Sequence, residues 1–179
     1  MSSSTTTRPA PAPRETREPL PERPREWGRF VNERGGYGLL LPRGWKPKPD
    51  GPQTLIRSFD RLVAISIAPD RSPEALETPI SDYATNTADG LRGFEDGFET
   101  RGMRGFDHRY QAIEALGGGR SRDGVEQDAS VFILRRDELV TLTVVLAANA
   151  KPAARESVRL ARRAIRTIRT RAPRDSGPR

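Results

Sequence analysis

The sequence contains no cysteine and a single histidine, His108. Without cysteine, disulfides, thiolate nucleophiles and cysteine-ligated zinc or iron–sulfur sites are excluded. A metal site built on two histidines is equally excluded. We therefore expect no catalytic residue, no metal and no cofactor, and a stability that comes from packing.

Long apolar runs are also absent. No segment approaches the roughly 18 apolar residues of a membrane span. Residues 1–13, MSSSTTTRPAPAP, lack the apolar stretch of a signal peptide. We expect a cytoplasmic protein with no integral membrane insertion, and the oligomeric state stays open.

What is present divides the chain into three parts. Residues 1–26 are rich in Pro, Arg and Glu and contain one large apolar residue, Leu20. Such a segment cannot bury enough surface to offset the entropy of ordering it. We expect a disordered arm there, a single domain over residues 27–171 and a disordered basic tail over residues 172–179. Pro21 and Pro24 also have the spacing of a minimal PxxP motif, a weak pattern by which the arm would itself be a proline-rich ligand of another protein.

The domain is organised around residues 125–171. Residues 125–136 and 139–148 predict two long strands joined by a tight turn at Asp137 and Glu138. The apolar run 131–134 indicates an interior strand. Residues 153–170 predict a helix that covers the sheet. Its apolar residues recur at helical spacing and are Val158, Ala161, Ile165 and Ile168.

Upstream segments complete the sheet. Strands are predicted at residues 29–32, 37–41, 54–59, 62–68, 98–103 and 109–116. A helix is predicted over residues 79–92, with Thr78 as its cap. Residues 46–52, with three prolines, predict a loop, as do residues 69–77, and the glycine-rich residues 117–124 predict a mobile turn. Together they predict an α+β fold with a mainly antiparallel central sheet of about six to seven strands flanked by helices.

Residues 37–45, YGLLLPRGW, the paired strands, the middle helix and the closing hairpin and helix resemble the PsbP-like superfamily, in particular its bacterial DcrB and LpqN branch. The resemblance covers residues 28–171 and includes Gln127 before the long hairpin. It implies a PsbP-like α/β/α sandwich and a non-enzymatic protein-binding function as adaptor, chaperone or assembly factor. The lipobox cysteine of the DcrB and LpqN lipoproteins is absent from this sequence.

The residues that could suggest an enzyme are better interpreted as structural. His108 has no G-x-S-x-G serine to act on, so we expect an ordinary surface or strand-edge histidine. Residues 117–119 are glycines without the G-K-[ST] ending of a phosphate loop. A solvated acidic face is expected where carboxylates gather, at Asp82, Asp89, Glu95, Asp96 and Glu99.

The excess of positive charge in the chain lies in residues 151–179. On a helix, six arginines fall within roughly one third of the circumference. They are Arg155, Arg159, Arg162, Arg163, Arg166 and Arg169. This arginine stripe predicts contact with another protein that has an acidic surface, with the sheet face as the other candidate surface. The alternatives are a solvated face, contact with an anionic lipid surface, and an electrostatic nucleic-acid binder that uses the stripe and the tail, although no aromatic residues alternate with the arginines.

Overall fold

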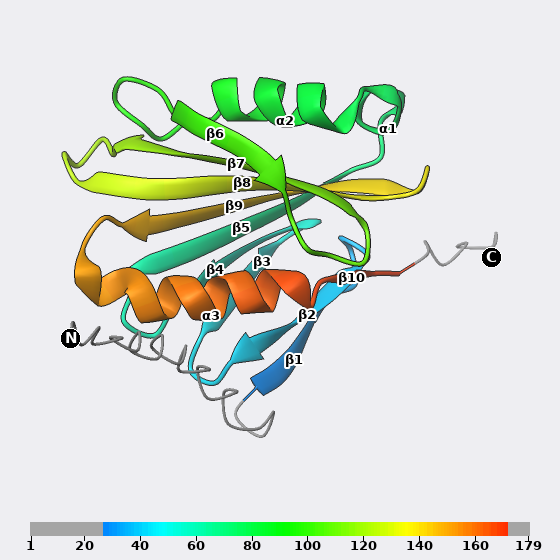
Figure 1. The fold of residues 1–179 in the computed structure, drawn as a ribbon. Coiled ribbons are helices and arrows are strands. Elements are labelled where there is room, and N and C mark those ends of the chain that lie inside the picture. The colour runs from blue at the N-terminus through cyan, green and yellow to red at the C-terminus, as the bar shows by residue number, and fades with distance from the viewer. Residues whose placement is uncertain (1–26, 172–179) are drawn as a thin grey trace, which may run out of the picture.

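The structure is a computed structural model, and it describes residues 27–171 (Figure 1). The arm predicted at residues 1–26 and the tail predicted at residues 172–179 lie outside the described residues. In chain order the elements are β1 (Trp27–Asn32), β2 (Tyr37–Pro42), β3 (Lys46–Asp50), β4 (Gln53–Arg57), β5 (Val63–Asp70), α1 (Pro73–Glu77), α2 (Ile80–Asp89), β6 (Glu99–Gly105), β7 (Gln111–Arg120), β8 (Glu126–Arg136), β9 (Val140–Asn149), the 3-10 helix η2 (Pro152–Ala154), α3 (Arg155–Arg166) and β10 (Arg169–Thr170).

Seven strands form one antiparallel sheet in the order β3-β4-β5-β9-β8-β7-β6, which confirms the predicted fold class. The closing hairpin β8–β9 lies inside this sheet, and Asp137 takes the left-handed backbone conformation its tight turn needs (φ 45°). Val131 to Leu134 are all buried, as predicted for an interior strand. A smaller sheet has the order β1-β2-β10.

The two longer helices cover opposite faces and different halves of the large sheet (Figure 1). On one face α2 packs on β6, β7 and β8, with Ala84, Ala88 and Val131 in the shared core. On the other face α3 packs on β5 and β9 and also on β2 of the small sheet. Each face of the large sheet therefore keeps one half that is largely free of helix.

The prediction of a loop over residues 46–52 is wrong, because β3 pairs along β4 from Lys46 to Asp50. The prolines were expected to prevent a ladder. Both Pro47 and Pro49 lie in an edge strand, two residues apart, so the donor that each lacks can belong to the unpaired side.

The predicted mobile turn at residues 117–124 is wrong for its three glycines, which belong to β7 and pair with β8. They are needed for close packing. A Cβ atom at Gly117 would collide with the ring of Phe98 and the carbonyl of Glu99, and one at Gly119 would come within 2.9 Å of the Phe94 ring. Two aromatic rings therefore pack onto a strip of bare backbone.

Helix boundaries differ from prediction at three places. The expected connection at residues 69–77 contains α1, capped by Ser72, whose hydroxyl accepts from the Ala75 N–H at 3.2 Å. Helix α2 begins at Ile80 and ends at Asp89, without a side-chain cap from Thr78.

No helix in residues 27–171 has both the length and the apolar character to cross a membrane.

The closing helix ends at Arg166, four residues earlier than predicted. The Thr167 hydroxyl donates to the Ala164 carbonyl at 2.7 Å and accepts from the Leu40 N–H at 2.8 Å. Pairing with the small sheet thus replaces the last helical turn. Arg169 lies in β10 and is not on the helical stripe, although Ile168 remains fully buried as predicted.

Candidate functional site

The structure does not place the six predicted arginines on one uniform surface. Arg163 leaves the stripe, with its guanidinium carbon 5.1 Å from the centroid of the Trp27 ring. Arg169 donates to the backbone carbonyls of Ile168 and Arg166. Arg159 is exposed and pairs with Glu156 at 2.7 Å. The other three, Arg155, Arg162 and Arg166, remain to border the half of the sheet that α3 leaves open.

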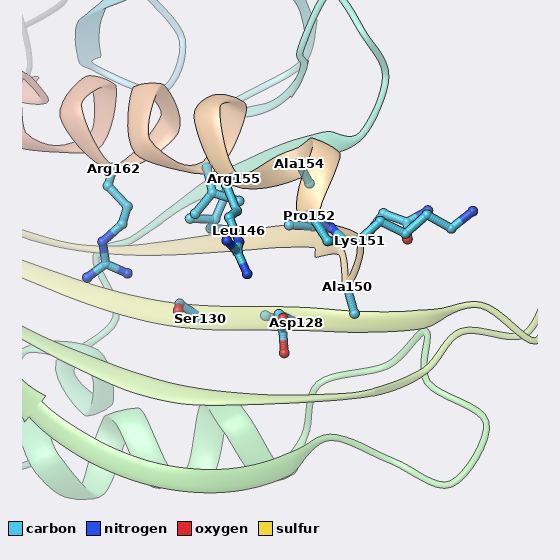
Figure 2. Close-up of a pocket in the computed structure, with 13 residues that line it drawn as sticks. Asp128, Ser130, Leu146, Ala150, Lys151, Pro152, Ala154, Arg155 and Arg162 are labelled. Carbon is cyan, nitrogen blue, oxygen red and sulfur yellow. The ribbon is translucent and has the colours of Figure 1, made fainter.

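A cleft of about 330 Å³ lies between the N-terminal half of α3 and the strands β8 and β9 (Figure 2). Its apolar walls include Leu146 of β9 and Val158 of α3. Its polar walls come from β8 and α3, and Figure 2 shows the arginines extending from the helix toward β8. These polar residues are Asp128, Ser130, Arg155 and Arg162, and Asn149 and Lys151 add polar groups at the end of β9 and just after it.

One end of the cleft is fixed by a buried carboxylate. Glu114 of β7 has a fully buried side chain, and its two oxygens accept from Arg162 at 2.5 and 2.6 Å. Arg104 of β6 donates to it at 2.9 Å. Burial raises the pKa of Glu114, but hydrogen bonds from Arg162, Ser130 and Arg104 outweigh burial and hold the pKa below its ordinary value. Glu114 is therefore ionised and fixes the position of Arg162.

Aromatic rings complete the support for these arginines. The guanidinium carbon of Arg162 lies 5.4 Å from the Phe132 ring centroid and 5.9 Å from that of Phe106. That of Arg166 lies 5.5 Å from Phe106. Such cation–π contacts hold the guanidinium groups in place without neutralising them. Two positive charges are thus held along the rim of the open half-sheet.

We call the α3-facing side of β6, β7 and β8, together with the cleft, the α3-side half-sheet. Arginine side chains from two elements extend over it: Arg101 and Arg104 from β6, and Arg155, Arg162 and Arg166 from α3. The carboxylates that meet them are Glu114 and Asp128, which pairs with Arg101 at 2.7 Å. The arginines outnumber the carboxylates, so the surface attracts anionic groups.

His108 is wrongly predicted as a surface or strand-edge residue. It lies half-buried in the loop between β6 and β7, beside the rings of Phe106 and Tyr110, and its Nδ1 accepts from the Tyr110 N–H at 3.1 Å. Burial, followed by the charge of Arg169, lowers the pKa of His108 to about 4. The imidazole is therefore neutral at neutral pH and packs as part of the loop.

The remaining candidates for chemistry stay dispersed. Within residues 27–171, no group of three or more His, Asp or Glu side chains could hold a metal ion. The acidic residues expected to be solvated are all exposed, namely Asp82, Asp89, Glu95, Asp96 and Glu99.

Sequence reasoning missed the residues that hold the arginines in place. Glu114 and Asp128 were not singled out, because carboxylates within strand sequences usually face solvent. A signal was present at Glu114: it alternates with Ala112 and Leu116 on one face of a strand. A charge within an apolar face needs a buried partner, and that pattern indicates a cation across the sheet.

No protein-family model matches the sequence, and no curated protein matches it. Solved structures do. Cyanobacterial PsbP from Synechocystis sp. PCC 6803 matches with a TM-score of 0.58 at 12% identity, over 81% of this chain and 92% of that one. A structure from Bacteroides thetaiotaomicron VPI-5482 matches with a TM-score of 0.58 at 12% identity, over 86% of this chain; the match spans about half of that protein, 52%. The Saccharomyces cerevisiae Ran-binding protein Mog1p matches with a TM-score of 0.49 at 9% identity, over 82% of this chain and 96% of that one.

At these identities the likeness concerns the fold alone. The arrangement of the large antiparallel sheet and its helices agrees with the resemblance drawn from residues 28–171. The chain has a PsbP-like fold.

Proposed function

We propose that the chain is a non-enzymatic, cytoplasmic protein-binding module of the adaptor, chaperone or assembly-factor kind. It holds an acidic, partly apolar segment of another protein on the α3-side half-sheet. The observation that carries this proposal is the cleft between α3 and β8, which combines apolar walls with an excess of fixed arginines.

The contacts of the arginines divide them by role. Neither Arg155 nor Arg166 makes an ion pair with any described residue, and both are exposed. Each can receive a carboxylate in the two-point geometry that suits a guanidinium group. Arg162 is held by Glu114 and acts as a positioned wall of the cleft. Arg159, Arg163 and Arg169 have contacts within the chain, and we assign them no direct part in binding.

The apolar part of the cleft favours a protein segment over a simple anion. Leu146 and Val158 line its walls between the polar groups. A ligand that places apolar side chains in this space gains binding free energy, because those side chains move out of water. A chain with acidic residues beside an apolar one matches both parts of the surface.

The observations do not favour nucleic acid as the ligand of the arginine stripe. The aromatic rings beside the stripe, Phe106 and Trp27, already stack with Arg162, Arg166 and Arg163. Phe106 is 8% exposed, so it offers no free face to a base.

The proposal is tested with a labelled peptide in which glutamates flank leucines, titrated by fluorescence anisotropy into the full chain. In the variant Arg155→Glu/Arg166→Glu we expect affinity to fall by about 10-fold or more, because two attractive contacts become repulsive. The matched control is Arg92→Glu/Arg122→Glu, which makes the same charge change at exposed sites away from the cleft. Equal losses in both variants, or an absence of binding by the wild type, would contradict the proposal.

A second measurement separates the cleft from its charged rim. Ala148, also in the cleft wall, is changed to Trp to fill the space beside Leu146. The peptide should then bind more weakly, whereas a peptide with glycines in place of the leucines should bind the variant and the wild type equally. Equal binding of the leucine peptide to both proteins would show that the apolar cleft takes no part.

A further inference from the structure

The second helix-free half of the large sheet lies on the α2-facing side of β3 and β4, at the opposite edge from β6. It contains a hollow of about 620 Å³. The side chains that shape it are Lys46 and Lys48 of β3, Leu55 and Arg57 of β4, and Phe59 and Arg61 of the β4–β5 turn. We call this surface the β3–β4 hollow. None of its lining residues is acidic.

The cations of the hollow have no partner within the described chain. Lys46, Lys48 and Arg57 are exposed, and none of them forms an ion pair with a residue in 27–171. Lys46 stands directly opposite Arg57 in the register of β3 and β4. Like charges at directly opposite positions destabilise a sheet. The fold therefore bears a local repulsion that an anionic ligand would relieve.

An exposed aromatic ring accompanies these charges. Phe59 is 81% exposed, against 8% or less for the buried Trp45 and Phe132 of the core. The nearest described atoms to the Gly44 position are those of the Phe59 ring, so the ring stands over the turn before β3. Between Arg57 and Arg61, it presents a free face to solvent beside positive charge.

The turn that carries Phe59 is held firmly. The Asp60 carboxylate accepts from the Ser58 hydroxyl at 2.5 Å and from the Leu62 N–H at 3.0 Å. Its other oxygen accepts from the Ser157 hydroxyl of α3 at 2.6 Å. Desolvation raises the pKa of Asp60, but these hydrogen bonds outweigh it and lower the pKa overall. Because Asp60 anchors the turn to α3, the backbone that carries Phe59 is ordered before binding, which reduces the entropy that binding costs.

We propose that the β3–β4 hollow binds single-stranded nucleic acid, with Phe59 stacking on a base and Lys46, Lys48 and Arg57 contacting phosphates. A cationic groove that tracks a backbone, combined with an exposed ring, is the arrangement by which proteins bind single strands without sequence preference. Lys46 and Lys48 lie two residues apart on one strand, about 7 Å along it, and so meet successive anionic groups of an extended ligand.

An added peptide strand is a poorer occupant of this edge. Pro47 and Pro49 lie in the edge strand β3, and neither can donate to a new strand. A ligand must therefore lie across the face of the strands and bind through its own anionic groups. A nucleic-acid strand brings a phosphate and a stacking base in every repeat.

The test uses the full chain and fluorescein-labelled oligo(dT) and oligo(U) of about 12 nucleotides, a length within the range of single-strand binding sites. Anisotropy is measured from about 50 to about 200 mM salt. With three or four phosphates contacted, the plot of log affinity against log salt should have a slope of about −2 to −3.

Variants assign the binding to this surface. Phe59→Leu keeps an apolar side chain but removes the ring, and affinity should fall by about 10-fold, whereas Phe59→Trp should keep it. Lys46→Gln/Lys48→Gln/Arg57→Gln should weaken binding further and bring the slope close to zero. The matched control, Arg92→Gln/Arg109→Gln/Arg122→Gln, removes the same charge from exposed positions outside the hollow and should bind as the wild type does.

Three results would overturn the proposal. The first is an equal loss in the two triple variants, which would assign binding to overall charge. The second is equal affinity in Phe59→Leu and the wild type, which would exclude stacking. The third is the absence of oligonucleotide binding, whether or not the hollow binds vesicles of anionic lipid or a polyglutamate peptide. Since the peptide test above concerns the other face, either proposal can fail without the other.

Discussion

The two helix-free halves of the large sheet are both basic, yet they differ in what their charges touch. On the α3-side half-sheet, Arg162 and Arg104 meet the buried Glu114, and Arg101 meets Asp128. In the β3–β4 hollow, Lys46 faces Arg57 with no carboxylate in the lining. In the α3-side half-sheet most charges form ion pairs that stabilise the fold. In the β3–β4 hollow the charges repel one another and have no such partners.

This difference shows why a count of positive charges does not identify a binding surface. The arginine stripe contains more cations than the hollow, but several of them are held by contacts inside the chain. The stability of the α3-side half-sheet should therefore fall when charge is removed. The free energy of unfolding should rise when a negative charge is introduced into the hollow.

The largest effect is expected at the buried carboxylate. Glu114→Gln leaves Arg162, with a side chain only 24% exposed, without its ionic partner. Removing one member of a buried pair costs about 3–5 kcal/mol of the free energy of unfolding, so a loss of about 3 kcal/mol is expected here. Urea unfolding followed by circular dichroism measures it.

The matched control is Glu126→Gln, which breaks the exposed pair between Glu126 and Arg120. That change should alter the free energy of unfolding by less than about 1 kcal/mol. Similar losses at Glu114 and Glu126 would mean that the α3-side half-sheet does not depend on its buried pair.

A smaller loss is expected from the glycine strip that keeps β7 closely packed. Gly117→Ala drives a Cβ atom into the Phe98 ring and the Glu99 backbone, and overpacking of this kind costs about 1–3 kcal/mol. Gly102→Ala is the control, because an added Cβ there meets nothing within 4 Å. Thermal unfolding of both variants should show a lower Tm for the first only, and a comparable decrease in both would argue against the packing account.

The loop beside the α3-side half-sheet should make stability depend on pH. The pKa of His108 is about 4 in the folded chain and 6.5 in its ordinary state, so the unfolded chain binds the proton first as the pH falls. The contribution of His108 is complete above pH 6.5 and decreases toward pH 4. A loss of about 1 kcal/mol is expected, because solvent still reaches the half-buried ring.

The variant His108→Gln isolates this contribution. Its unfolding free energy should change less than that of the wild type between about pH 6.5 and pH 4.5. Below its ordinary value of 4.5, Glu114 adds its own loss in both proteins, because its pKa is lowered in the folded state. Parallel pH profiles for the two proteins would show that His108 is not buried as described.

The smallest effect has the opposite sign and belongs to the hollow. Lys46→Glu converts the pair opposite Arg57 from repulsive to attractive and should stabilise the chain by about 0.2–1 kcal/mol. The same change should weaken oligonucleotide binding. A destabilised Lys46→Glu variant would remove the contrast between the two halves.

Much of the fold could be predicted from the chain itself. The alternation in residues 140–146 and the apolar run 131–134 predict the central hairpin, because side-chain period and burial are local properties of a strand. The errors occur where a distant partner decides the local structure. Pro47 and Pro49 are tolerated because β3 is an edge strand, and residues 117–119 form strand because Phe94 and Phe98 pack on them.

The candidate site was predictable only in part. Helical spacing gathers Arg155, Arg162 and Arg166 on one side of α3, as predicted. Helical spacing cannot show that Arg162 pairs with Glu114, 48 residues away in sequence. Nor can it show that Arg169 lies in strand β10 and not in the helix. Which cations remain available to a partner depends on these long-range contacts, and so does the distinction between the two halves.

The most direct test of the account is a backbone amide NMR titration of one sample of the full chain with the acidic peptide and, separately, with oligo(dT). The peptide should shift amides lining the α3 cleft, such as those of Asp128, Ser130 and Arg155, and leave those of Lys46 and Phe59 unchanged. The oligonucleotide should do the reverse. If both ligands shift the same amides, the two halves are not distinct binding surfaces, and the account is wrong.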